Sequence, residues 1–179
     1  MGEFIVSNAE SAPLDMLLKP FSSIGHDWML ITAGRSVERG EWNTMTASWG
    51  SFGVFWNRRV ITCVIRPTRH TYSFVEKADL ITFSFFHPEM KKALQVCGST
   101  SGATVDKAQE ASLTPLLLEP DAVGFNEARL NIVCRKIYAQ DIDPHLFIDA
   151  QIDTNYPQKD YHRMYLCEIL RVYQEEKKT

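Results

Sequence analysis

Long hydrophobic runs are missing from this sequence of 179 residues. The longest apolar run, around residues 80–86, is far shorter than the ~18 residues that a membrane helix requires. The first residues carry Glu3 where a secretory signal peptide would carry a basic residue, and their apolar run is shorter than about 7–15 residues. We therefore expect a cytoplasmic protein without a membrane partner.

An excess of charge of one sign is also missing, because the formal net charge is only −3. Proteins that bind nucleic acid usually present a broad basic surface, so we expect no nucleic-acid partner. The common phosphate-binding motifs are absent too: no G-x-G-x-x-G follows an expected strand, and no G-x-x-x-x-G-K-[ST] occurs. Neither a Rossmann dinucleotide site nor a P-loop is therefore supported.

Cysteine is sparse and widely spaced, at Cys63, Cys97, Cys134 and Cys167. No C-x-x-C pair occurs, and no histidine stands at zinc-finger spacing from a cysteine. The pattern favours four reduced thiols that are buried as small hydrophobic side chains, and it predicts no metal site.

Linkers of low complexity and internal repeats are absent as well, which favours one domain. Short runs rich in β-branched and aromatic residues, or with alternating polarity, predict strands at 28–34, 60–66, 80–86, 129–135, 146–153 and 164–173. Helices are predicted at 71–78, 87–98 and 106–113. Many strands with few helices predict a mainly β protein, a β-barrel or sandwich with added helices, and not a doubly wound sheet.

The segment NTMTASWGSFGVFW, residues 43–56, combines hydroxyl groups, glycines and indole rings. On a strand, its side chains would alternate between two faces: Thr44, Thr46 and Ser48 on one, and Met45, Ala47 and Trp49 on the other. Gly50 and Gly53 would let another molecule approach the backbone closely. Such a surface suits a flat heteroaromatic ring such as a flavin. The alternative is an edge strand whose tryptophan belongs to the core.

The segment IRPTRHTYSF, residues 65–74, places two guanidinium groups between a strand and a helix. Arg66 and Arg69 flank Pro67, and hydroxyl residues follow. A helix N-terminus offers unpaired N–H groups, and arginine matches the geometry of phosphate oxygens. The segment therefore predicts a phosphate site. The alternative is that both arginines pair with surface carboxylates such as Asp79 or Glu76.

Four motifs together resemble the flavin reductase-like family of FMN-binding split β-barrel proteins, which includes the flavoredoxins. They are NTMTASWG, VIRPTRHTYSF, CGSTSGATVDK and DYHRMYLCEI, in this order and spacing. The resemblance runs from about residue 21 to 172. It implies a split barrel of Greek-key topology that forms a homodimer, with FMN in a groove near the subunit interface.

The resemblance also implies a division of the chain. Residues 21–173 would form the flavin reductase-like domain. Residues 1–20 would be an N-terminal extension that is poorly ordered or packed on the partner subunit, and residues 174–179 would be a charged tail.

The resemblance assigns cofactor-binding residues in three segments. The isoalloxazine ring and ribityl chain would contact Asn43, Thr44, Met45, Thr46, Ala47, Ser48 and Trp49. The phosphate end would lie near Arg66, Pro67, Arg69, Thr71 and Tyr72. The segment that closes over the flavin would supply Gly98, Ser99, Ser101, Gly102 and Lys107. His162 would stand at the open face, where a nicotinamide or another electron partner arrives, unless its role is structural.

Two positions depart from the family pattern. Ala103 and Thr104 stand where S-G-R-D-x-D-K has an Arg–Asp pair, which bears on loop closure and partner choice. Cys167 stands in place of a glycine, which bears on packing.

The implied function is that of an FMN-binding oxidoreductase that passes electrons from NAD(P)H through flavin to an acceptor. The acceptor would be free flavin, ferric iron or a redox protein, and the choice between NADH and NADPH stays open, as does whether FMN is prosthetic or a substrate. The backbone of residues 44–49, with Lys107, would stabilise the reduced ring. One alternative is a flavoredoxin-type electron-transfer protein without nicotinamide activity. Another is a non-catalytic module that binds a small ligand.

Overall fold

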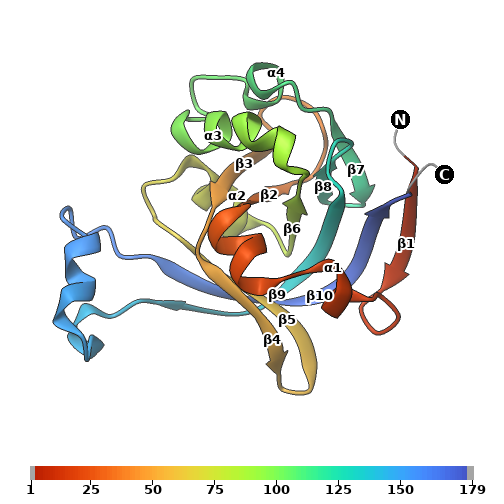
Figure 1. Cartoon of the computed structure of the whole chain (residues 1–179). Helices are drawn as coiled ribbons and strands as arrows, with labels where there is room; N and C mark the ends of the chain where they lie inside the picture. The colour runs from red at the N-terminus through yellow and green to blue at the C-terminus, as the bar shows by residue number, and fades with distance from the viewer. Residues whose placement is uncertain (1–2, 177–179) are drawn as a thin grey trace.

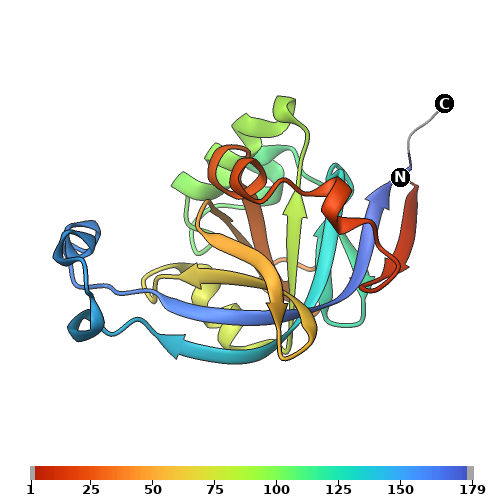
Figure 2. The same cartoon turned by 60° about the horizontal axis from the view of Figure 1, so that its bottom comes forward.

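A computed structural model of the chain describes residues 3–176. Its main feature is an eight-stranded antiparallel sheet in the order β3-β2-β6-β9-β10-β5-β4, with β1 paired to β10. The strands are β1 (Phe4–Asn8), β2 (Met29–Gly34), β3 (Trp42–Ala47), β4 (Gly50–Phe55), β5 (Arg58–Ile65), β6 (Leu80–Phe85), β9 (Leu130–Asp141) and β10 (Arg163–Glu175). The sheet curls around the core in both views (Figures 1 and 2). The prediction of a mainly β protein is confirmed.

The last strand, β10, pairs with two different strands along one of its edges. Its first half, from Arg163 to Glu168, pairs with β5, whereas its second half pairs with β1. On its other side β10 pairs with β9, and the register shifts between Leu166 and Cys167. The shift lies at the position where the family pattern has glycine, and the Cys167 side chain is buried there in the core.

Helices and a small hairpin pack around the sheet (Figure 1). They are α1 (Leu14–Leu17), the π-helix η1 (Phe21–His26), α2 (His70–Lys77), the short 3-10 turn η2 (Pro88–Met90), α3 (Lys91–Ser99), α4 (Lys107–Ala111), β7 (Pro115–Glu119) and β8 (Ala122–Phe125). Each of the three predicted helices is present within one to four residues of its expected ends, and Pro88 and the Asp106 N-cap mark two of the starts. None of the helices in residues 3–176 is both long and apolar enough to span a bilayer.

Burial of the central strands explains why their sequences are apolar on both faces. All of β6 after Leu80 is buried, as the sequence predicts, because β6 lies between β2 and β9. The expectation holds only partly for β5, in which buried residues alternate with partly exposed ones. The four cysteines are unpaired and buried, which confirms their prediction as core residues.

One strand prediction is wrong. Residues 146–153 are not a strand but belong to a projecting connection between β9 and β10, residues 142–162, which we call the arm (Figures 1 and 2). It contains the 3-10 helices η3 (Pro144–Leu146) and η4 (Ala150–Asn155). Asp143 and Asp149 cap these helices by accepting hydrogen bonds from the backbone two residues ahead. These local bonds compete with strand pairing, and the apolar residues of the alternating pattern are exposed.

The N-terminal residues are part of the domain. Strand β1 pairs with β10 from Phe4–Glu175 to Asn8–Arg171, and Ala12 and Leu14 are buried in the main core. Residues 4–8 thus belong to the sheet of this chain and Ala12 and Leu14 to its core, and packing of the N-terminal segment on a partner subunit stays a prediction. The expected tail begins inside β10, which runs to Glu175, and residues 177–179 lie outside the described residues.

Candidate functional site

Two adjoining cavities lie where the hydroxyl-rich strand β3 ends. The first, which we call the Trp49 cavity, has a volume of about 160 Å³. Its lining combines residues of the first two predicted segments with His162 and adds Val64: Met45, Thr46, Ala47, Ser48, Trp49, Val64, Arg66, Arg69 and His162. Arg66 directly follows β5 and His162 directly precedes β10. Because β5 and β10 pair in the sheet, these two residues meet at the cavity although they are far apart in the sequence.

The second cavity, which we call the Trp28 cavity, has a volume of about 370 Å³. It is lined by Trp28, Thr46, Ser48, Leu94, Gln95, Gly98 and Ser99. Thr46 and Ser48 line both cavities, so the two form one site along the end of β3. Together they fall within the ~300–1,000 Å³ that small-molecule sites usually occupy.

Helix α3 packs tightly on β3 at this site. The Thr46 hydroxyl donates a hydrogen bond to the Leu94 carbonyl. A Cβ atom at Gly98 would meet the Thr46 Cβ at 3.2 Å, which is tighter than ordinary van der Waals contact. The absence of a side chain at position 98 therefore permits the close approach of helix and strand between the two cavities.

The first two residues of the predicted ring site face elsewhere. The Asn43 amide donates to the Thr71 hydroxyl at 2.7 Å, which ties β3 to the start of α2. The Thr44 hydroxyl is buried and bonds to the hydroxyl of Thr32 at 2.8 Å and to the Ile31 carbonyl at 3.2 Å. Both side chains therefore hold the sheet together, because buried polar groups need partners.

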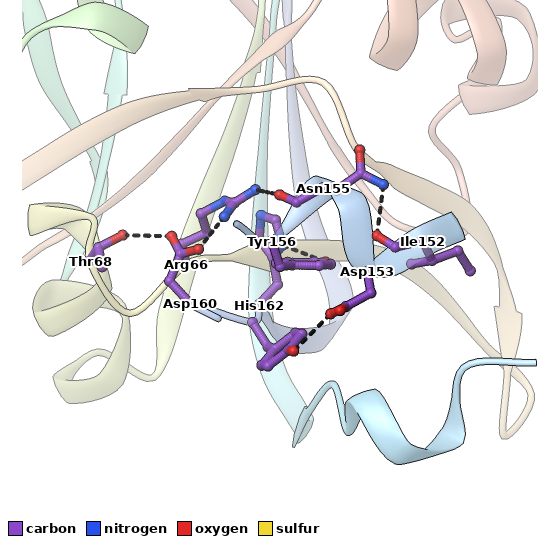
Figure 3. Close-up of polar contacts among 9 residues, drawn as sticks. Arg66, Thr68, Ile152, Asp153, Asn155, Tyr156, Asp160 and His162 are labelled. Atoms are coloured by element: carbon purple, nitrogen blue, oxygen red, sulfur yellow. Dashed lines mark hydrogen bonds and ion pairs between the residues drawn. The ribbon is translucent and has the colours of Figure 1, made fainter. Parts of the chain in front are cut away.

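Arg66 is engaged by the arm. Its guanidinium pairs with the Asp160 carboxylate at 2.5 Å, donates to the Asn155 carbonyl at 2.8 Å, and lies 4.9 Å above the centre of the Tyr156 ring (Figure 3). The alternative prediction, that Arg66 pairs with a carboxylate, is therefore confirmed. The carboxylate is that of Asp160, however, and not that of Asp79 or Glu76. Two nitrogens of Arg66 thus already have hydrogen-bond partners, one of them a carboxylate.

Arg69 is in a different situation, although it lines the same cavity. It is the N-cap residue of α2, and its side chain donates one hydrogen bond, at 3.0 Å, to the Gly98 carbonyl. No carboxylate of residues 3–176 lies within ion-pair distance of it. Guanidinium carries five N–H donors, so Arg69 is the cation that the structure leaves available for an anion at the Trp49 cavity.

His162 is buried at the wall of the Trp49 cavity, just before β10. Its ring centre lies 5.2 Å from that of Trp49, and its Nδ1 lies 2.9 Å from the Tyr156 hydroxyl. Burial, together with the nearby guanidinium groups of Arg66 and Arg69, lowers the pKa of His162 to about 4, although Asp160 acts in the opposite direction. The imidazole is therefore neutral at physiological pH.

Lys107 does not reach either cavity of the site. Its buried ammonium donates to the carbonyls of Thr44, at 2.7 Å, and Cys97, at 2.8 Å. It lines a separate small cavity of about 110 Å³ together with Asn43 and Gly102. Burial lowers the pKa of Lys107 to about 8. The lysine thus joins β3 to the end of α3, and a place beside a flavin ring stays a prediction.

Several other predicted residues lie away from the two cavities. Pro67 is exposed in the turn before α2, Thr71 is buried as the partner of Asn43, and Tyr72 packs on the main core. Ser101 and Gly102 belong to a loop that closes on itself, because the Ser101 carbonyl accepts from the Val105 amide and Gly102 packs on the Asn43 side chain.

The same loop contains Ala103 and Thr104. The Thr104 hydroxyl and backbone amide both donate to the Ser101 carbonyl, so local bonds order this turn where the family has an Arg–Asp pair.

Four predicted residues, Thr46, Ser48, Gly98 and Ser99, line the Trp28 cavity, whereas sequence reasoning missed Trp28, Leu94 and Gln95. Trp28 has a left-handed backbone, with φ 72°, and the Lys91 ammonium lies 3.2 Å above its ring centre. Leu94, Gln95, Gly98 and Ser99 follow the i, i+4 spacing of one helix face, which is a signal that could have located the wall. Nothing in the local sequence marks Trp28, because its position depends on Lys91 of a distant helix.

A larger cavity, of about 710 Å³, lies apart from this site, between the β2–β3 turn and α2. Charged residues of both signs line it, among them Arg35, Glu41, Lys77, Asp79 and Asp121. The lining has no indole wall and includes none of the predicted cofactor-binding residues. The smaller pair of cavities therefore fits the predicted chemistry better.

No protein-family model matches the sequence, and comparison with curated proteins gives no match either. Solved structures do match. A flavoredoxin from Methanosarcina acetivorans is 22% identical, with a TM-score of 0.64 over 84% of this chain and 69% of that one. An FMN-binding domain of a flavin reductase-like enzyme from Shewanella baltica is 14% identical, with a TM-score of 0.64 over 98% and 80%. The NADH:FAD oxidoreductase of Streptomyces globisporus is 15% identical, with a TM-score of 0.61 over 83% and 74%. The chain therefore has the split-barrel fold of the flavin reductase-like proteins and flavoredoxins, which confirms the fold that its motifs predict.

Proposed function

We propose that the chain is an FMN-binding flavoprotein oxidoreductase of the flavin reductase type. The observation that carries the proposal is the site of two adjoining cavities along the end of β3, which has an indole on each side and Arg69 at its rim. Two structural relatives support it, one named as an FMN-binding domain of a flavin reductase-like enzyme and the other as an NADH:FAD oxidoreductase.

The residues of the site fit the parts of FMN. Met45, Ala47 and the Trp49 indole provide an apolar surface for the ring, and Arg69 with the start of α2 provides positive potential for the phosphate. Ser48 and Trp49 lie between β3 and β4, outside the register of both strands, so their backbone groups can bond to the polar rim of a ring. FMN would supply the atom that accepts a hydride, and the chain orients it.

The chain also shapes the electrostatics of the site. Positive potential from Arg69, and backbone N–H groups after β3, would favour the negative charge that a flavin gains on reduction. Neutral His162 adds no charge at physiological pH, because burial and the guanidinium groups keep its pKa low. The remaining open wall of the Trp49 cavity is where an electron partner would approach.

NAD(P)H is the proposed electron donor, and a small molecule or a redox protein the acceptor. The named activity of the Streptomyces relative favours the nicotinamide donor. The flavoredoxin relative favours a second candidate, an electron-transfer protein that retains FMN without nicotinamide activity. A non-catalytic binding module is the third.

A spectroscopic titration separates the three candidates. We expect the purified protein to bind FMN, as isolated or when FMN is added, and the visible flavin absorbance to bleach when NADH or NADPH is added without oxygen. Bound FMN that neither nucleotide reduces would favour the electron-transfer candidate. A protein that remains colourless after FMN is added would contradict flavin binding altogether.

A homodimer is a further part of the proposal. The arm ends in exposed apolar side chains, of which Leu146 is 69% exposed and Ile148 fully exposed. Phe55 and Trp56 at the β4–β5 turn are also largely exposed, and the Trp56 ring lies 6.2 Å from that of Tyr138. Exposed apolar groups of this kind are typical of surfaces that a partner covers.

A further inference from the structure

The base of the arm holds one tyrosine in a fixed position. Tyr156 is buried, and its ring stacks on Phe147 with ring centres 6.1 Å apart and an angle of 20° between the planes. Tyr161 packs on it at 4.9 Å, and the Arg66 guanidinium covers a face (Figure 3 shows Arg66 beside it). Because aromatic and cationic neighbours surround the Tyr156 ring, the ring is held in one orientation. The packing of the arm therefore fixes the direction in which the Tyr156 hydroxyl points.

The hydroxyl of Tyr156 determines the tautomer of His162. In the described part of the chain its hydrogen-bond partner is the Nδ1 atom of His162, at 2.9 Å. If Nδ1 carried the proton, the buried hydroxyl would have a proton without an acceptor, which is costly. If Tyr156 donates to Nδ1, both groups are satisfied. The proton of the neutral imidazole then resides on Nε2.

The surroundings keep this imidazole neutral. The charged and titratable groups that act on it are Arg66, Arg69 and Asp160, with Tyr156 as its hydrogen-bond partner. Burial and the two guanidinium groups disfavour the imidazolium, and Asp160 favours it but is paired with Arg66. Because His162 lines the Trp49 cavity and its Nδ1 is bonded to Tyr156, Nε2 is the nitrogen left to act as an uncharged N–H donor to an uncharged acceptor.

We propose that Tyr156 is a positioning residue that holds His162 as the Nε2–H tautomer, so that His162 donates a hydrogen bond to the carbonyl oxygen of an uncharged conjugated group bound in the Trp49 cavity. The proposal rests on the proposed function, because the ligand would be the molecule that exchanges electrons with the flavin. Two sources share this chemistry: the carboxamide of a nicotinamide donor, and an α,β-unsaturated ketone acceptor. His162 neither gains nor loses a proton in this role.

The first test needs no flavin and reads the tautomer directly. Long-range proton–nitrogen NMR of the histidine side chains, with His162→Gln to assign the signal, should show His162 protonated on Nε2 in the full-length protein. Tyr156→Phe, which keeps the ring, should give mixed tautomers and a higher pKa for His162, because the lost hydroxyl stabilised the neutral form.

Tyr161→Phe is the matched control for the first test. It removes a hydroxyl of the same arm, bonded to Asp153 at 2.8 Å, and should leave the His162 signal unchanged. A wild-type His162 protonated on Nδ1, or a tautomer that Tyr156→Phe does not alter, overturns the proposal.

The second test measures rates in the FMN-loaded protein. Tyr156→Phe should slow one of two reactions by about 2- to 10-fold, the effect of one hydrogen bond. The two reactions are flavin reduction by NADH or NADPH, and flavin reoxidation by 2-cyclohexenone without oxygen. FMN affinity should not change. An effect on reduction identifies the nicotinamide carboxamide as the ligand, and an effect on reoxidation identifies the ketone.

A double-mutant cycle separates positioning from a general structural role. The side chain of glutamine has one amide whose N–H can donate without help from Tyr156, so Tyr156→Phe should have no further effect in the His162→Gln background. Additive losses, or unchanged rates in both reactions, overturn the proposal. If the protein does not bind FMN, the proposed function fails, and the NMR result still decides the tautomer.

Discussion

Arg66 and Arg69 are three residues apart, yet the structure gives them different partners. Arg66 forms an ion pair with Asp160 and holds the base of the arm, whereas within residues 3–176 the Arg69 side chain bonds to one backbone carbonyl, that of Gly98. An arginine whose donors are committed to a carboxylate contributes less to a new anion than one that is available. The phosphate role expected of both is therefore assigned here mainly to Arg69.

Arg69→Ala should weaken FMN binding by about 1.5–3 kcal/mol, which is roughly 10- to 150-fold in Kd, because charge-assisted hydrogen bonds to the phosphate are lost. Fluorescence titration with FMN and with riboflavin measures it, and riboflavin, which lacks the phosphate, should bind as before.

Two arginine variants control this experiment. Arg58→Ala removes an exposed guanidinium that is paired with Glu168 and should not change FMN affinity. Arg66→Ala should cost less FMN affinity than Arg69→Ala. The reverse order would show that Arg66 leaves Asp160 to bind the phosphate.

At the scale of elements, the site depends on how β3 and α3 are joined. The Lys107 ammonium bonds to one carbonyl of each, and Thr46 bonds to a carbonyl of α3. These bonds place the two cavities side by side, since Thr46 and Ser48 line both. The buried lysine is thus a structural tie beneath the site.

Lys107→Met should destabilise the fold by about 1–3 kcal/mol at pH 7, because two buried carbonyls lose their donor. The difference should grow with pH. The pKa of Lys107 is about 8 in the folded protein and ordinarily about 10.4 when unfolded, so between these values the unfolded chain binds more protons and a rise in pH stabilises the wild type.

Urea unfolding of the wild type and Lys107→Met at pH 7 and pH 9.5 measures the difference. Lys92→Met, at an exposed position of α3, is the matched control and should not change stability with pH in this way. A stability difference that is constant with pH would mean that the lysine is not desolvated in the fold.

For the whole molecule, the arm and the paired termini lie at opposite ends (Figures 1 and 2). The arm is anchored at its base by Arg66 and by the hydrogen bond from the Ile142 amide to the His162 carbonyl, 2.9 Å long. Its outer part exposes apolar side chains. A second copy of the chain is the occupant that we propose for this surface.

Ile148→Ser should weaken or abolish the dimer, because a fully exposed isoleucine gains stability only when a partner covers it. Light scattering across a concentration series gives the mass in solution. Val6→Ser, at an exposed position of β1 at the other end of the molecule, should leave the mass unchanged. A wild type that is monomeric at high concentration would contradict the dimer.

What the sequence determined by itself is local. The apolar run of β6, the proline and aspartate that begin helices, and the hydroxyl-rich strand that ends at a cavity all follow from patterns within a few residues. Such patterns predict elements because strand and helix periods act between near neighbours. The order of the four motifs also indicated the split-barrel fold.

Tertiary structure alone decided which side chains meet. Arg66 pairs with Asp160, 94 residues away, and Lys107 bonds to Thr44, 63 residues away. Residues 146–153 alternate like a strand but have no strand beside them, so their aspartates cap short helices instead. A side chain's partner depends on which elements the sheet order brings together, and local periodicity carries no information about that order.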